Sequence, residues 1–132
     1  MFGIDTNVLL RYLTGDDHRQ SPRAAAEMAK ANAQNPAFIS LITLIEAAWV
    51  LQSPSYGYSA AEVVTVFSEL AGADNVRLQN AAAVQRALGD CIATGCHLPD
   101  ALVARLGVAE GCEYTATFDK RATKALPAMR RI

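Results

Sequence analysis

Short apolar segments that alternate with helical patterns constrain the fold of this chain most strongly. Four such segments occupy residues 2–4, 37–40, 76–78 and 114–117, and a stretch with helical periodicity follows each of them. Strands that alternate with helices form a parallel sheet with helices on both of its faces. We therefore predict an α/β fold with three layers, in which a central parallel sheet of four to five strands lies between helices. The tail PAMRRI would either add a fifth strand at the edge of the sheet or trail loosely.

Length and charge narrow the class of protein further. The chain has 132 residues, which fits a single domain over residues 1–132. Its formal net charge of −1 is not that of a protein that holds nucleic acid by bulk charge. No apolar run is long enough to cross a membrane, and no signal-peptide pattern opens the chain. We expect a cytoplasmic protein without a membrane segment.

Four carboxylates occupy positions where an acid is unfavourable. Asp5 directly follows the first apolar segment, and Glu46 lies within the apolar helical stretch ITLIEAAWVLQ. Asp100 precedes the apolar ALVA, and Asp119 follows the fourth predicted strand. A buried carboxylate without a partner would destabilise the fold by several kcal/mol or take up a proton. The chain has no matching set of basic residues at buried-looking positions. We therefore predict that these acids share a divalent cation.

Each of these acids also has an ordinary structural interpretation. Asp5 and Asp100 fit helix N-caps or first-turn acids, Glu46 fits an outward-facing helix position, and Asp119 fits a turn. Their combination favours a site, because three of the four follow or lie near the ends of strands, where α/β sheets bind ligands. Oxygen ligands favour Mg²⁺ or Mn²⁺. A cation of this kind that keeps bound water suits hydrolysis of a phosphate ester.

Four sequence blocks carry a resemblance to a known family. They are DTN at residues 5–7, ISLITLIEAAWVL at residues 39–51, LPDALVA at residues 98–104 and TATFDKR at residues 115–121. In this order they resemble the PIN-domain ribonucleases, and among these the VapC-type toxins of bacterial toxin–antitoxin pairs. The resemblance covers essentially the whole chain. One departure is Leu98-Pro99, where relatives often have an aromatic and a small residue before the third acid.

The resemblance implies a PIN-like fold and a Mg²⁺- or Mn²⁺-dependent endoribonuclease. Its metal ligands and catalytic residues would be Asp5, Glu46, Asp100 and Asp119. The residues that hydrogen-bond these acids or the metal-bound water would be Thr6, Asn7 and Thr117. A homodimer is also implied, together with a small cognate antitoxin that covers the RNA groove.

Basic residues lie next to two of the acids in the sequence. Arg11 follows Asp5 on the first predicted helix, and Lys120 and Arg121 follow Asp119. They are either RNA-binding groups that hold phosphates beside the metal or ordinary solvated charges.

Two other functions are consistent with parts of this pattern. One is a catalytically inactive module that keeps the fold and binds RNA or protein, although the complete acidic set argues against it. The other is a phosphohydrolase or receiver-like domain, which usually needs a second acid beside the first. DTN lacks that adjacent acid.

Overall fold

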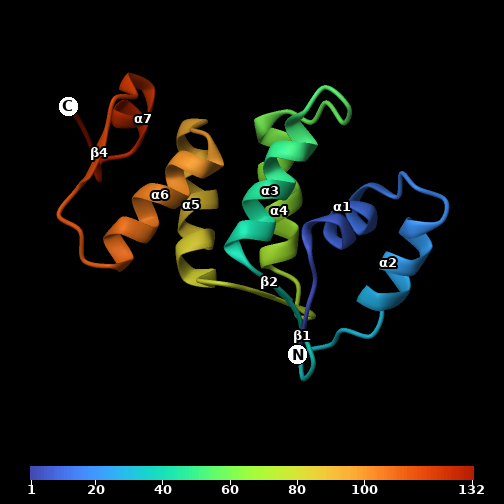
Figure 1. Cartoon of the computed structure of the whole chain (residues 1–132). Coiled ribbons are helices and arrows are strands. Elements are labelled where there is room, and N and C mark those ends of the chain that lie inside the picture. Colours follow the sequence, from blue (N-terminus) through green and yellow to red (C-terminus); the bar gives the residue numbers. More distant parts are fainter. The chain divides into compact units, whose positions relative to one another are not determined.

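The computed structural model describes residues 1–132, which form two compact units (Figure 1). The first unit comprises Met1–Tyr58 and Glu69–Gln79, and the second comprises Ser59–Ser68 and Asn80–Ile132. None of the helices has the length and apolar character that crossing a membrane requires.

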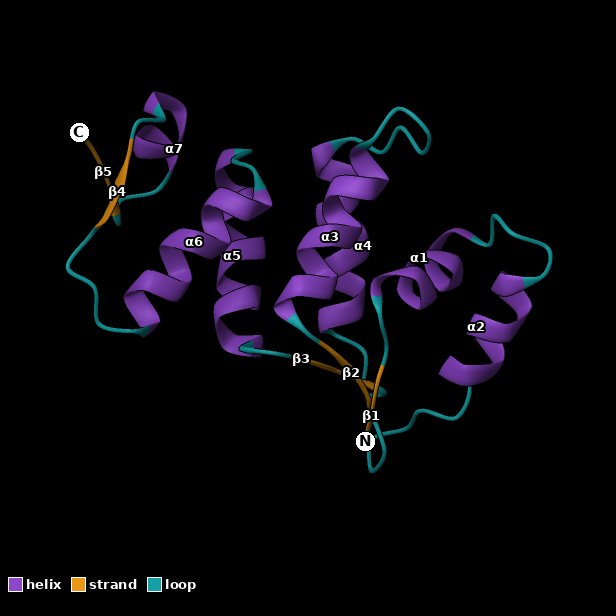
Figure 2. Ribbon diagram, viewed as in Figure 1, coloured by secondary structure: helices purple, strands orange, loops and turns teal.

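The first unit contains a parallel sheet of three short strands in the order β1-β2-β3 (Figure 2). Its elements in chain order are β1 (Phe2–Gly3), α1 (Thr6–Thr14), α2 (Gln20–Met28), β2 (Ala37–Ile39), α3 (Leu41–Gln52) and β3 (Val76–Leu78). Helix α1 contacts both α2 and α3. Fully buried side chains from α1, β2 and α3 form the core, namely Leu9, Ile39, Leu44 and Leu51.

The helices of the first unit begin and end at residues suited to those positions. The Ser40 hydroxyl accepts a hydrogen bond from the Thr43 backbone N–H at 3.1 Å and so caps α3. Gly15 ends α1 with a φ of +61°, a conformation that glycine adopts without steric cost. Because Ser40 is the cap, α3 begins directly after the end of β2. Gly15 limits α1 to nine residues.

The second unit contains a helical pair and a parallel sheet of two strands. Its elements are α5 (Ala81–Thr94), α6 (Leu98–Ala109), β4 (Thr115–Thr117), α7 (Lys120–Ala125) and β5 (Met129–Arg131). Arg105 of α6 donates two hydrogen bonds of 2.7 Å to the Asp90 carboxylate of α5. Helix α6 also contacts β4, and a Cβ on Gly107 would lie 2.8 Å from Thr115 Oγ1. Any other residue at position 107 would require Thr115 Oγ1 to move.

Helix α4 (Ala60–Ala71) has residues in both units. Ser59 and Glu62 form the capping box that the sequence indicates at its start. The Glu62 N–H donates to Ser59 Oγ and the Ser59 N–H donates to Glu62 Oε1, both at 3.1 Å. Val63, Phe67 and Leu70 are buried, so one face of the helix is apolar as its spacing predicts.

The predicted α/β class with parallel strands is confirmed, and five strands are present, including one from the C-terminal tail. The hydrogen-bonded ladders differ from the single central sheet that we predicted, since they join three strands in one unit and two in the other. Each strand has only two or three residues, so no ladder contains more than a few hydrogen bonds.

The second helix differs from the sequence-based expectation at both ends. The pair Ser21-Pro22 predicts a helix capped by Ser21, but α2 begins at Gln20 with Arg19 as its N-cap, and Ser21 is buried within the helix. The Asp17 carboxylate accepts the N–H groups of Arg19 and Gln20 at 2.9 and 2.7 Å. The helix ends at Met28 and not near Ala33. The cause is a turn at Asn32, whose side-chain oxygen accepts two backbone N–H groups and so competes with helical hydrogen bonds.

Candidate active site

Asp5 follows β1 and caps helix α1. Its backbone is extended, and Oδ1 accepts a hydrogen bond from the Val8 N–H at 2.9 Å. This bond satisfies one of the amides that a helix start leaves free, and it fixes the rotation of the carboxyl group. The second oxygen, Oδ2, has no hydrogen-bond partner in the protein. The capping interpretation of Asp5 is therefore correct, and it leaves one oxygen available to a cation.

Glu46 belongs to the same cavity as Asp5 in the first unit. The cavity measures about 550 Å³, and the polar residues that line it are Asp5, Thr6, Asn7, Arg11, Thr43, Glu46 and Tyr56. Thr6 Oγ1 donates a hydrogen bond to Glu46 Oε2 at 3.2 Å. Because Thr6 is the first residue of the helix that Asp5 caps, this contact links the two carboxylates through one residue.

Asp100 and Asp119 line one small cavity in the second unit. It measures about 80 Å³, and its lining residues are Gly95, Cys96, His97, Asp100, Asp119, Arg121 and Ala122. Asp119 caps α7, since its Oδ1 accepts the N–H groups of Arg121 at 2.8 Å and Ala122 at 3.0 Å. These bonds, with that from Ala122 foremost, lower the pKa of Asp119 below its usual value. Asp100 lies in the first turn of α6.

The polar residues expected beside the acids occupy different kinds of position. Thr6 contacts the Glu46 carboxylate directly. Thr117 Oγ1 accepts a hydrogen bond of 3.0 Å from the backbone N–H of Asp119, so it orients the chain that carries the acid. Asn7 is exposed and lines two cavities together with Asp5.

The four acids are more accessible than the sequence suggests. Asp5, Glu46 and Asp119 are exposed and Asp100 is half-buried, so the expectation of buried carboxylates is wrong. Two of the acids are exposed because they stand at helix starts. Glu46 is exposed because it lies on the outer side of α3, with Ile42 and Trp49 at 71% and 61% exposure. None of the four acids forms a salt bridge with a lysine or arginine.

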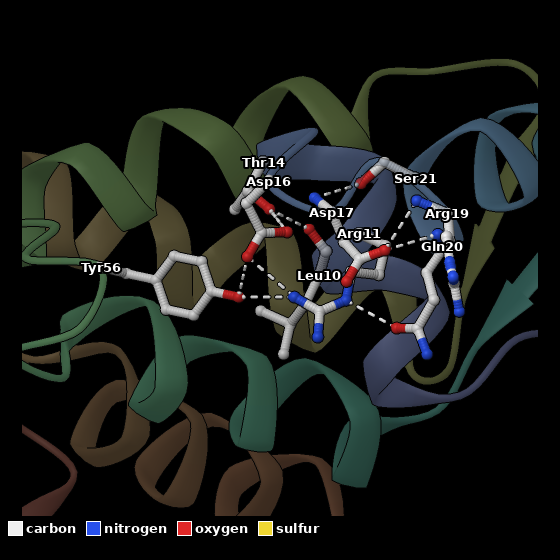
Figure 3. A network of polar contacts seen from close by, with 9 residues as sticks. All are labelled: Leu10, Arg11, Thr14, Asp16, Asp17, Arg19, Gln20, Ser21 and Tyr56. Atoms are coloured by element: carbon white, nitrogen blue, oxygen red, sulfur yellow. Dashed lines mark hydrogen bonds and ion pairs between the residues drawn. The ribbon is translucent and has the colours of Figure 1, made fainter.

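The predicted basic residues lie close to the acids but differ in their surroundings. Arg11 lines the Asp5 cavity and is held by neighbouring side chains (Figure 3). Arg121 lines the cavity of Asp100 and Asp119. Lys120 is exposed and opens α7. Each pair of acids therefore has an arginine beside it.

The donor set of each unit fits part of a Mg²⁺ or Mn²⁺ site. Neither unit by itself holds a group of three His, Cys, Asp or Glu side chains that could bind a metal ion. Each unit brings two carboxylates to one cavity, and the capping hydrogen bonds of Asp5 and Asp119 use only one oxygen of each. Magnesium typically takes a few carboxylates and retains water. That all four acids share one ion stays a prediction.

Several cavity residues are not among the site residues that the sequence predicts. Tyr56 lies in the loop after α3, and its hydroxyl reaches Asp16 and Arg11, which are 40 and 45 positions away in the chain. His97 and Cys96 lie in the connection between α5 and α6 and line the second cavity. The αL glycine Gly95, which ends α5, is the one local sign that this connection turns sharply.

Comparison with known proteins agrees with these observations. The comparison with curated proteins yields no match. A family model described as the PIN domain matches residues 3–126, which is nearly the whole chain and includes all four acids. The chain therefore belongs to the PIN-domain family, a family of nucleases.

Proposed function

We propose that this chain is a metal-dependent endoribonuclease that hydrolyses phosphodiester bonds in RNA. Asp5, Glu46, Asp100 and Asp119 hold Mg²⁺ or Mn²⁺. The observation that carries the proposal is that each unit places two carboxylates at one cavity, with oxygens that no protein group occupies. Membership of a nuclease family supports the same chemistry.

The side chains of the first unit have separate tasks in this proposal. Asp5 is held rigidly by its bond to Val8, so its free oxygen has a defined position. The Thr6 hydroxyl restricts Glu46 by the 3.2 Å hydrogen bond. Arg11 and Asn7, which line the cavity with them, contact the phosphate and sugar of the strand. A bound divalent ion supplies an acidified water and neutralises charge on the phosphate oxygens.

The second unit contributes the other two carboxylates, Asp100 and Asp119. Asp119 is fixed by two backbone hydrogen bonds, from Ala122 and Arg121, which also lower its pKa. Arg121, in the same cavity, and the adjacent Lys120 hold phosphates of the RNA.

Cleavage of a labelled RNA by the purified protein tests the proposal. We expect cleavage with Mg²⁺ or Mn²⁺ and none with EDTA. Asp5→Asn, Glu46→Gln, Asp100→Asn and Asp119→Asn should each lower the rate by about 100-fold or more, because a metal ligand contributes several kcal/mol. Asp74→Asn and Glu113→Gln remove exposed acids outside both cavities and serve as matched controls.

Two results would contradict the assignment. If the four variants cleave as fast as the parent, these acids do not carry the reaction. If calorimetry detects no binding of Mg²⁺ or Mn²⁺ and no RNA is cut, the chain is the alternative, a non-catalytic module that binds RNA or protein. A single binding stoichiometry that weakens in all four variants would support one shared ion.

We further propose that the chain is the toxin of a type II toxin–antitoxin pair, that it acts in the cytoplasm, and that it forms a homodimer bound by a small antitoxin. The support is the resemblance of its four motif blocks and the exposed apolar residues Ile42 and Trp49, which share one side of α3. A short neighbouring gene whose product blocks cleavage would support the pairing. A clean monomer at micromolar concentration would contradict the dimer.

A further inference from the structure

Arg11, which the proposed function places against the RNA phosphate, is held by a hydrogen-bonded network of side chains (Figure 3). Arg11 Nε donates to Gln20 Oε1 at 2.8 Å. Its Nη1 donates to Asp16 Oδ2 at 2.8 Å and to the Tyr56 hydroxyl at 3.1 Å. The Tyr56 hydroxyl in turn donates to the same Asp16 oxygen at 2.6 Å. Three side chains therefore hold the guanidinium group of Arg11 through its Nε and Nη1 atoms.

The partners of Arg11 are themselves fixed by local structure. Thr14 Oγ1 lies 2.7 Å from Asp16 Oδ1, and the backbone N–H of Gln20 donates to Asp17 Oδ1 at 2.7 Å. Tyr56 lies in a loop whose backbone N–H groups return to the end of α3, at Ser53. The hydrogen bond from Tyr56, followed by that from Thr14, keeps the pKa of Asp16 well below its usual value. These hydrogen bonds therefore favour the ionised form of Asp16.

The network lies beside the predicted metal ligand of the first unit. Arg11 lines two cavities, one with Glu46 and Tyr56 and the other with Gln20 and Arg23, and Asp5 lines both. Arg11 Nη2 makes no hydrogen bond within the protein, while Nε and Nη1 are occupied. The side that remains free is the one that a phosphate oxygen could occupy.

We infer that Arg11 is a preoriented phosphate-binding group for the RNA strand next to the cleaved bond, and that Tyr56 and Asp16 are positioning residues for it. The inference rests on the proposed function. Because Asp16 neutralises the charge of Arg11, the group acts through the direction of its hydrogen bonds and not through long-range attraction. The loop that carries Tyr56 thereby becomes part of the substrate site.

A purely structural role predicts different behaviour. The same contacts would then join the end of α1 to the start of α2 and to the loop after α3, and their loss would lower stability without changing the affinity for RNA. Positioning of Arg11 instead predicts weaker RNA binding with the chemical step intact. The separation of KM from kcat distinguishes the two roles.

The test compares Tyr56→Phe with Tyr58→Phe. The first removes a hydroxyl from the network and keeps the ring, and the second removes a hydroxyl that makes no hydrogen bond in the protein. We expect Tyr56→Phe and Asp16→Asn to raise the KM for RNA by about 3- to 10-fold with kcat unchanged. Arg11→Lys keeps the charge but not the planar guanidinium group. It should therefore bind RNA as weakly as Arg11→Ala does. Tyr58→Phe should match the parent.

Fluorescence anisotropy with a labelled RNA in EDTA measures binding without cleavage. If the parent cuts RNA but the Tyr56 and Asp16 variants keep its KM, or lose only thermal stability, the inference is wrong and the proposed function stands. A fall in kcat at unchanged KM would also overturn it. If the parent cuts no RNA, yet its binding in EDTA weakens in the Arg11 and Tyr56 variants, the nuclease proposal fails, and only the positioning of Arg11 for phosphate binding by Tyr56 is supported.

Discussion

Replacing Asp5 by alanine and by asparagine separates its capping role from its proposed role at the metal. The carboxylate accepts the Val8 N–H through Oδ1 alone. Alanine removes this acceptor, and loss of an N-cap typically lowers the free energy of unfolding by about 1 kcal/mol. Asparagine keeps an oxygen in the same place and is an equally good cap. It loses only the interaction of a negative charge with the helix dipole, about 0.5 kcal/mol at an exposed helix end.

These free energies translate into measurable shifts of the melting temperature. Unfolding entropy is about 2.1 cal/mol/K per residue near 60 °C, so about 1 kcal/mol in a chain of 132 residues corresponds to roughly 4 °C. We therefore expect Asp5→Ala to melt about 4 °C below the parent, and Asp5→Asn within about 2 °C of it. Both variants should lose RNA cleavage, because neither keeps a negatively charged ligand for the cation.

Ser40→Ala provides the matched control. Ser40 caps α3 through its hydroxyl but lines neither cavity, so its loss should lower the melting temperature by a similar amount and leave cleavage intact at 25 °C. Thermal unfolding and a cleavage assay on the same preparations provide both readouts. The reasoning is refuted if Asp5→Asn destabilises as much as Asp5→Ala, or if Ser40→Ala abolishes cleavage.

Two further predictions concern stability. The pKa of Asp16 is lower in the folded protein than in the unfolded chain, so its ionised form contributes stability above about pH 4 that is lost as the pH falls through the folded pKa. The difference in melting temperature between the parent and Asp16→Asn should therefore narrow in acid. A difference that widens in acid would contradict this sign. Gly95 has a φ of +72° with no neighbour near an added Cβ, so Gly95→Ala should lower the free energy of unfolding in urea by about 1 kcal/mol. Gly89 lies inside α5 and also has no neighbour near an added Cβ, so Gly89→Ala should stabilise the protein slightly. Equal effects at both glycines would exclude backbone strain as the cause.

Features that depend on neighbours a few residues apart could be predicted from the sequence. The cap at Asp5 and the capping box of Ser59 and Glu62 involve contacts within about one helical turn, and the structure confirms them. The α/β class follows from the same kind of information, because the alternation of short strands with helices is visible along the chain.

Features that depend on distant contacts could not be predicted in this way. The helical spacing of Ile92 with Val84 and Leu88 predicts that it lies on the inner face of α5, yet Ile92 is 71% exposed. Spacing specifies a face but not how far a neighbouring element covers it. The contact of Tyr56 with Arg11 joins residues 45 positions apart, and no local pattern indicates it. The start of α2 at Gln20, and not at Ser21, depends on the path of the preceding loop, in which Asp17 accepts the Gln20 N–H.

The capping and metal-binding interpretations of the acids, which the sequence leaves as alternatives, are compatible in the structure. Strands of two or three residues with few ladder bonds hold a side chain at their ends only loosely, so a carboxylate placed there needs another restraint. At Asp5 and Asp119 the helix start supplies it, by binding one oxygen and leaving the other free. Amide N–H groups at the same helix starts also offset the repulsion between neighbouring negative charges. The residue types that favour helix capping therefore provide rigid oxygen ligands, and an N-cap aspartate at a strand end is consistent with a metal site.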